Sequence, residues 1–499
     1  MELKFEKFPC RCIRGLMREV QNLEQTQELR LPDGMPDIGR VIAAWGQVVL
    51  RSKEWRGDGI GAAGGVMAWV LYGPDDGTEP QCIDIWLPFQ GKWSFPETDQ
   101  EGIIRINPVL RSVDARIVSG RKLMIRANVG IWAEALITCE PDVYVPSEMP
   151  EGVELLRHTY PVRLPKEAKE KTFMLDEELT LPGSCPKVEK VLRFEMVPQL
   201  VDSRVMAGKV VFRGNGLLHI LYWGDDGKLH TWDFEIPFSQ FAELEEEFGS
   251  DADANIILAT TNLELDKMED GSLRLKCGLV AQALITDQIL LELAEDAYSP
   301  TREVAATFCQ AMLPAVLDDR GEQLTVELQI ETDCRNILDV QVMPDHPVVN
   351  RLADHVKTVQ AGSVQVLYED SAGGVQSIVR RWEKNLDIEA SDDCDVAVML
   401  QQFSVSSALM GEGQLNLKGN VKLLSRTDST RGLQMISAIE LGEMKKADPN
   451  RPSVILRRTE GKRLWDLAKE CGTNVLTICQ TNGLTEEPDP GRMLLIPVI

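Results

Sequence analysis

The stretch LPDGMPDIGRVI occupies residues Leu31–Ile42, and a related stretch, LPGSCPKVEKVL, occupies Leu181–Leu192. Both follow the pattern L-P-x-x-x-P-x-[I/V]-x-[R/K]-V-[I/L]. Downstream of each copy, a tyrosine precedes an Asp-Gly dipeptide, and Tyr222 lies 150 positions after Tyr72, which is also the separation of the two proline motifs. The segment ALIT occurs twice as well, at 135–138 and 283–286. Repetition at a nearly fixed spacing predicts a domain-sized internal duplication.

A third, more divergent copy follows the second. VLYEDSAGG surrounds Tyr368, 146 positions after Tyr222, and GQLNLKGNVKLL from Gly413 is similar to GSLRLKCGLVAQ from Gly271. The proline motif is missing from this copy, and we place the segment Cys334–Leu338 at its position. The chain is therefore expected to contain three copies of one unit.

Each copy has the pattern of antiparallel β-structure. In the second copy apolar residues alternate with polar ones up to Tyr222, Asp226-Gly227 favours a tight hairpin, and Pro237 ends the return strand. The proline motif either begins a short helix at Pro36 and Pro186 or forms a corner between strands, which suits it better. We predict a mainly β fold of three tandem antiparallel, sandwich-like domains. Three tyrosines are expected at equivalent positions, with a tryptophan on each return strand: Tyr72, Tyr222 and Tyr368, then Trp86, Trp232 and Trp382.

Composition limits the classes of function. The chain has 499 residues, with 53 Lys+Arg against 78 Asp+Glu and a formal net charge of −25, so its surface repels nucleic acid and anionic lipid. Its length predicts three or four domains. The N-terminus mixes both charge signs and lacks the apolar run of a secretory signal, and no stretch is long and apolar enough to span a membrane. Eleven cysteines are expected to be reduced thiols in a cytosolic protein.

Motifs for catalysis or metal binding are weak. Gly59, Gly61 and Gly64 spell G-x-G-x-x-G, but the repeat aligns them with a plain strand, so a glycine-rich strand or loop is favoured over a dinucleotide site. Cys10-x-Cys12 lacks a second cysteine pair at zinc spacing. His219 and His230 could meet across one hairpin, yet two imidazoles without a third ligand rarely bind a metal. We therefore predict no cofactor, no metal and no enzymatic activity.

After a polar linker, Glu443–Pro452, the pattern changes to β-α-α-β. This segment resembles a LysM domain in the residues Thr459, Gly461, Leu464, Trp465, Asp466, Leu467, Ala468, Gly472, Val475, Ile478, Asn482, Leu484, Gly491, Leu494, Ile496 and Pro497. The resemblance implies a groove for N-acetylglucosamine polymers, formed here by Gly461, Lys462, Arg463, Leu464, Asn482, Gly483 and Leu484. The family usually has a short polar residue after the glycine that can cap the first helix, whereas this chain has Lys462 and Arg463, which cannot accept that hydrogen bond. A basic pair at the groove favours an acidic protein surface as the ligand.

The repeated unit, with its L-P-D-G-x-P-D-I-G-R-V motif, V-L-Y strand and L-P-F segment, is similar to the SPOCS domain of bacterial sporulation proteins. Tandem SPOCS domains followed by one LysM domain form the layout of SipL-type clostridial spore-coat morphogenetic proteins. The expected domains are residues 1–147, 148–297 and 298–446, the last degenerate, and a LysM domain at 452–499.

This resemblance implies a mother-cell protein at the forespore surface, which joins the coat-basement morphogenetic ATPase, stage-four sporulation protein A, through the LysM domain. The main alternative is a cell-wall protein that binds peptidoglycan or N-acetylglucosamine oligomers. An enzyme on a β scaffold is a third class, disfavoured by the missing motifs.

Overall fold

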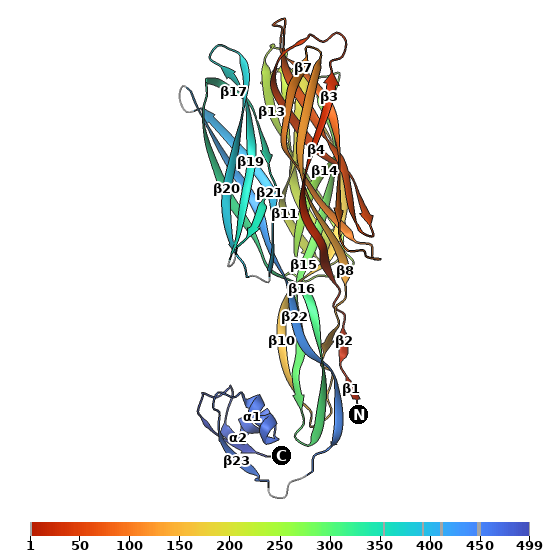
Figure 1. Cartoon of the computed structure of the whole chain (residues 1–499), viewed down its shortest axis with the longest axis vertical. Helices are drawn as coiled ribbons and strands as arrows, with labels where there is room; N and C mark the ends of the chain where they lie inside the picture. Colours follow the sequence, from red (N-terminus) through yellow and green to blue (C-terminus); the bar gives the residue numbers. More distant parts are fainter. Residues whose placement is uncertain (1, 353–354, 392–393, 410–412, 447–450, 499) are drawn as a thin grey trace.

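The computed structural model describes residues 2–352, 355–391, 394–409, 413–446 and 451–498. The molecule is elongated: a broad head of packed β-sheets narrows into a stalk, and a small helical module lies beside the far end of that stalk (Figure 1). All strand pairs in the described ranges are antiparallel. The predicted mainly β, antiparallel fold is confirmed. Residues 447–450 of the predicted linker lie outside the described residues.

The head contains three units, each made of two facing sheets. In the first unit the sheet orders are β3-β8-β7 and β4-β5-β6. Its strands are β3 (Cys12–Arg30), β4 (Ile38–Arg56), β5 (Gly59–Pro74), β6 (Gln81–Ser94), β7 (Ile103–Ser119) and β8 (Lys122–Cys139). Apolar side chains from both sheets, such as Val66 and Ile125, form one core between them.

The second unit repeats this order as β10-β15-β14 and β11-β12-β13. Its strands are β10 (Glu154–Leu179), β11 (Val188–Met206), β12 (Lys209–Gly224), β13 (Leu229–Glu243), β14 (Asp253–Lys267) and β15 (Leu273–Tyr298). The third unit follows the same scheme with one short extra strand, β18, against β19. Its strands are β16 (Arg302–Glu331), β17 (Cys334–Pro344), β18 (Val348–Arg351), β19 (His355–Asp370), β20 (Val375–Glu389), β21 (Cys394–Leu409) and β22 (Gln414–Met444).

The proline motif forms a corner before β4 and β11, so the helical interpretation of Pro36 and Pro186 is wrong. Proline at these positions leads directly into a strand, and the adjoining β-bulges turn the chain. The hydroxyl of Tyr72 donates to the Pro36 carbonyl at 3.2 Å, and that of Tyr222 donates to Pro186 at 3.3 Å. These two tyrosines therefore hold the two corners in the same way.

The register of the three units agrees at the level of single residues. Val41 pairs with Tyr72, Val191 with Tyr222, and Ile337 with Tyr368, and each of these pairs is flanked by bulges at the same two positions. The expected equivalence of the three tyrosines is thus confirmed. The tryptophans lie on the return strands β6, β13 and β20 as expected. The G-x-G-x-x-G glycines lie within β5, as the strand interpretation predicted.

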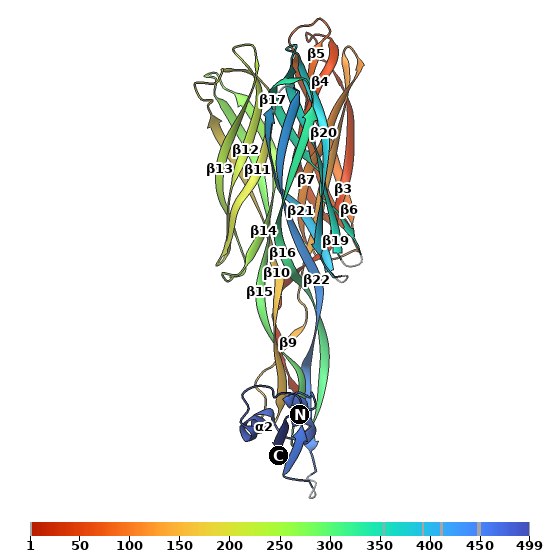
Figure 2. The same ribbon diagram turned by 90° about the vertical axis from the view of Figure 1, so that its left-hand side faces the viewer.

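Six strands of the three units run on beyond the head or are continued by short strands, and so build the stalk (Figures 1 and 2). The lower halves of β10 and β15 form one two-stranded ribbon, and those of β16 and β22 form a second. The third ribbon is β2 (Glu6–Phe8) against β9 (Val143–Val145), and β1 (Glu2–Lys4) adds to β22. All three ribbons contribute to one apolar core, to which Val143, Val162 and Leu313 belong. The stalk therefore ties the N-terminal segment to the second and third units.

Candidate functional site

The predicted groove belongs to the C-terminal module, whose elements are β23 (Val454–Arg458), α1 (Leu464–Cys471), α2 (Val475–Asn482) and β24 (Met493–Pro497). This is the β-α-α-β order expected from the sequence. Both helices end at a glycine in the left-handed conformation, Gly472 and Gly483, and Asn474 caps α2 by accepting from the Thr477 N–H at 2.7 Å. The helix bounds place loop 460–463 directly before α1 and loop 483–490 directly after α2.

The first loop turns sharply at Glu460 and Gly461, both with positive φ, and the Lys462 N–H donates to the Thr459 carbonyl. Arg463 stands at the position before α1 and makes no capping bond, as the sequence predicted. The cap comes from the opposite loop instead: the Glu487 carboxylate accepts from the Leu464 N–H at 3.0 Å. A carboxylate at a helix N-terminus is also stabilised by the helix dipole. One side chain thus spans the two loops.

Two of the predicted groove residues, Asn482 at the end of α2 and Leu484 in the second loop, serve mainly to hold the module together. The Asn482 side chain donates to the carbonyls of Ile478 and Leu495 and accepts from the Leu495 N–H, so it fastens α2 to β24. Leu484 packs on the apolar core that contains Leu464. The structure therefore brings the predicted loops together, but gives Asn482, Leu464 and Leu484 internal contacts and leaves Lys462 and Arg463 on the rim.

The two basic residues on the rim already face carboxylates of α1. Lys462 pairs with Glu470, and Arg463 pairs with Asp466 at 3.2 Å. The hydrogen bond from Lys462 lowers the pKa of Glu470, and the bond to Asp466 raises the pKa of Arg463. Exposed pairs of this kind contribute only about 0–1 kcal/mol. A partner's carboxylates can therefore replace them at little cost.

The module is docked on the second unit through helix α1, which the sequence did not reveal. The Trp465 ring N–H donates to Asp296 at 2.8 Å, Lys469 pairs with the same carboxylate, and the Tyr298 ring meets Trp465 edge-on at a centroid distance of 4.8 Å. The Tyr298 hydroxyl donates to the Thr473 carbonyl. Trp465 and Tyr298 are both buried. Asp296 and Tyr298 belong to the last residues of β15, so the module docks on the end of this strand.

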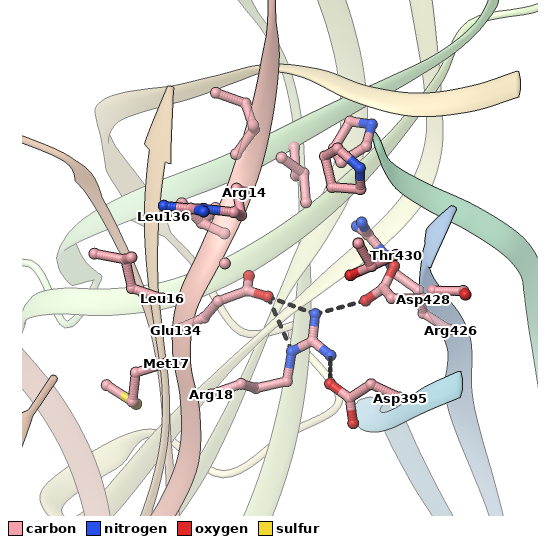
Figure 3. A pocket seen from close by; sticks show the side chains of 16 residues that line it. Arg14, Leu16, Met17, Arg18, Glu134, Leu136, Asp395, Arg426, Asp428 and Thr430 are labelled. Atoms are coloured by element: carbon pink, nitrogen blue, oxygen red, sulfur yellow. Dashed lines mark hydrogen bonds and ion pairs between the residues drawn. The ribbon is translucent and has the colours of Figure 1, made fainter. Parts of the chain in front are cut away.

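A second candidate site is a pocket of about 300 Å³ where the three units meet. Arg18 lies at its centre and points its guanidinium at carboxylates from the first and third units (Figure 3). Its nitrogens lie 2.8 Å from Glu134, 2.8 Å from Asp428 and 3.2 Å from Asp395. The pocket is therefore lined by groups that already bind one another.

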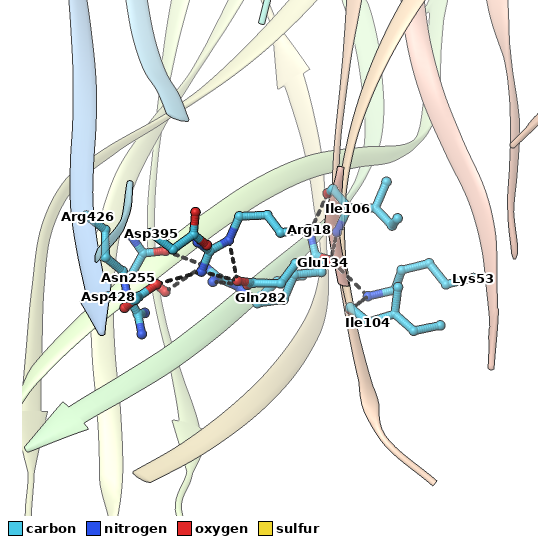
Figure 4. Close-up of polar contacts among 11 residues, drawn as sticks. Arg18, Lys53, Ile104, Ile106, Glu134, Asn255, Gln282, Asp395, Arg426 and Asp428 are labelled. Atoms are coloured by element: carbon cyan, nitrogen blue, oxygen red, sulfur yellow. Dashed lines mark hydrogen bonds and ion pairs between the residues drawn. The ribbon is translucent and has the colours of Figure 1, made fainter. Parts of the chain in front are cut away.

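The polar network continues inward to the second unit (Figure 4). Arg105 pairs with Glu134 at 2.9 Å and also bonds Asn255, while the Gln282 side chain exchanges two hydrogen bonds with the backbone of Ile106. Burial alone raises the pKa of Glu134, but the surrounding arginines outweigh it and lower the value to about 2. Arg18 joins the first unit to Asp428 of the third, and Arg105 joins it to Asn255 of the second, so we assign the pocket a structural role.

A second junction lies between β4, β11 and β17. Arg193, fully buried, binds Asp339 at 2.8 and 3.0 Å, and its guanidinium lies 5.3 Å from the centre of the Trp45 ring. His219 bonds Asp339 as well, at 2.8 Å, and bonds Asp233 with its other ring nitrogen. Arg193 and Asp339 occupy the same register position of two units. Opposite charges at that one position of the repeat are the signal that could have revealed this contact.

The two histidines considered as metal ligands each bond a different carboxylate. His219 lies opposite Asp233 and bonds Asp339, whereas His230 lies opposite Tyr222 and bonds Asp226, so the two imidazoles do not share a site. Within the described ranges, no group of three or more His, Cys, Asp or Glu side chains is arranged to hold a metal ion. Among the same residues, no helix is long and apolar enough to cross a membrane.

In comparison with protein families, a family model described as SipL, SPOCS domain, matches residues 187–266. This stretch covers β11 to β14, in the second unit. No curated protein and no solved structure matches the chain.

Proposed function

We propose that this protein is a non-enzymatic scaffold of spore-envelope assembly, built from three SPOCS-type domains and a C-terminal LysM domain. The family match on residues 187–266 carries this proposal. The paired bulges around Val41, Val191 and Ile337 support extending it to the other two units. The domains are taken as residues 1–147, 148–297, 298–446 and 452–499, and the site of action as the mother-cell side of the forespore surface.

The proposed partner is the coat-basement morphogenetic ATPase, stage-four sporulation protein A. The proposed contact surface is the groove of Gly461, Lys462, Arg463, Leu464, Asn482, Gly483 and Leu484. Two observations support it: Lys462 and Arg463 stay exposed although α1 docks on the second unit through Trp465, and these rim cations pair only with exposed carboxylates. An acidic segment of the partner would displace Glu470 and Asp466, because exposed ion pairs exchange at small cost.

The alternative ligand is peptidoglycan or an N-acetylglucosamine oligomer, favoured by the β-α-α-β order that the module shares with LysM domains. In this chain Glu487 bonds the Leu464 N–H across the two loops. A sugar entering between the loops would have to displace that carboxylate. This contact favours a protein ligand on the rim over a glycan between the loops.

The test compares full-length protein with the variant Lys462→Glu/Arg463→Glu, using surface-immobilised ATPase at several salt concentrations. We expect slower association and an inverted salt dependence, since rim charges mainly steer encounter. The matched control is Lys209→Glu/Arg213→Glu, which reverses two exposed charges on β12 and should leave binding unchanged. Binding that survives the rim reversal would reject the groove. Binding of N-acetylglucosamine oligomers with no affinity for the ATPase would reject the partner.

A further inference from the structure

Three thiols gather at the neck between the head and the stalk. Cys12 and Cys139 face each other across β3 and β8, with their sulfurs 3.3 Å apart. Cys10 lies two residues before Cys12, and the neighbouring Cys12 thiol lowers the pKa of Cys10. Cys10 and Cys12 are buried, whereas Cys139 is partly exposed to solvent.

The thiol pair lies where one ribbon of the stalk is interrupted. The ladder of β3 and β8 ends at the Cys12–Cys139 pair, and pairing resumes only at Phe8 with Val143. The other two ribbons run from the head into the stalk as single strands, β10 with β15 and β16 with β22. The first ribbon thus lacks backbone pairing at the point where its partners are continuous. A covalent link between Cys12 and Cys139 would lock the last rung before this gap.

We propose that Cys12 and Cys139 form a reversible disulfide. This redox modification site would covalently join β3 to β8 at the neck, where the N-terminal ribbon of the stalk begins. The oxidant is a low-molecular-weight disulfide of the oxidised-glutathione class. The Cys139 thiolate attacks one sulfur of that disulfide, forms a mixed disulfide and expels the first small thiolate. Cys12 loses its proton and attacks the Cys139 sulfur, which expels the second. Two protein thiols are oxidised by two electrons, and the oxidant leaves as two small thiols carrying the two protons.

The surroundings assign the order of attack. The hydrogen bond from Cys12 lowers the pKa of Cys139, and Arg14 acts in the same direction. The same bonds raise the pKa of Cys12, because its proton is shared with Cys10 and Cys139. The thiolate is the nucleophile in disulfide exchange. The partly exposed Cys139 therefore reacts first with the oxidant, and the buried Cys12 completes the bridge.

Other thiols of the chain provide internal controls. Cys82 and Cys277 are buried in the head, and burial raises the pKa of each to about 12. At neutral pH neither has appreciable thiolate. Both should stay reduced under conditions that oxidise the neck.

The experiment equilibrates the full-length, reduced protein in glutathione redox buffers, traps free thiols by alkylation and maps peptides by mass spectrometry. We expect a peptide pair joined through Cys12 and Cys139, lighter by two hydrogen atoms than the separate reduced peptides, with Cys82 and Cys277 alkylated. A bridge between Cys10 and Cys12, or oxidation of Cys82 and Cys277 at the same potential as the neck, would overturn the proposal. Retention of alkylated Cys12 and Cys139 in fully oxidised glutathione would overturn it as well.

Variants test the consequence for the stalk. Oxidation should raise the melting temperature of the unaltered protein, since the bridge encloses the whole first unit and restricts the unfolded chain. Cys139→Ser should lose this redox-dependent shift, while Cys277→Ala should keep it. A shift that persists in Cys139→Ser would contradict the assignment. If a variant does not fold, the mass-spectrometric mapping of disulfides in the unaltered protein still tests the proposal.

Discussion

At the scale of single residues, His219 makes the stability of the head depend on pH. Burial by itself lowers the pKa of His219, but its bonds to Asp233 and Asp339 raise it to about 9. A group whose pKa is higher in the folded state stabilises the fold at low pH and loses that effect as pH rises. The contribution is complete below an unfolded pKa of roughly 6.5 and disappears through pH 9, a loss of about 3 kcal/mol.

Urea unfolding at a series of pH values measures this effect. We expect the free energy of unfolding to fall between pH 6.5 and 9 in the unaltered protein, and the fall to be much smaller in His219→Gln. His158→Gln serves as the control, because His158 lies on the stalk strand β10 away from this junction. Parallel pH profiles for the unaltered protein and His219→Gln would contradict the prediction.

At the scale of elements, helix α1 depends on a carboxylate from another loop for its first turn. Glu487 accepts from the Leu464 N–H, and Arg463, which precedes the helix, provides no cap. Glu487→Ala should therefore destabilise α1 by about 1 kcal/mol, the usual value of a lost N-terminal cap. Amide hydrogen exchange of α1 should rise by a matching factor of about 5. Glu486→Ala, one residue away, should leave that exchange unchanged; an equal effect of both changes would contradict the capping role.

At the scale of the whole molecule, a buried ion pair joins the second and third units through the equivalent strands β11 and β17. Arg193→Met leaves Asp339 buried without its main cation, and should cost roughly 3–5 kcal/mol. The matched control is Arg274→Met, which removes an exposed pair with Asp176 inside the second unit and should cost less than about 1 kcal/mol. Thermal unfolding of the full chain is the measurement. Equal costs for the two variants would mean that the junction adds nothing to the stability of the head.

The sequence by itself determined the strands and their turns. Alternation of apolar side chains and the Asp226-Gly227 hairpin are local properties, because each depends on residues a few positions apart. The predicted strand end at Pro237 is wrong: β13 continues to Glu243, with Pro237 opposite Asn215. β13 is an edge strand, where the missing N–H of a proline is tolerated. The repeat spacing then aligned Tyr72, Tyr222 and Tyr368 correctly, since equal sequences adopt equal registers. The order of elements in the C-terminal module, and the inability of Arg463 to cap α1, followed from the same local rules.

Only the tertiary structure decided what covers each surface. From the sequence, Trp465 belongs to the C-terminal module alone. Its ring N–H, however, donates to Asp296, which lies 169 positions earlier in the chain. Arg193 and Asp339 look like unrelated charges until β11 and β17 are brought side by side. Periodicity tells which face of a strand is buried, but not which distant segment covers that face. That choice depends on how the three units and the stalk pack together, because a buried charge is tolerated only where the fold supplies its partner.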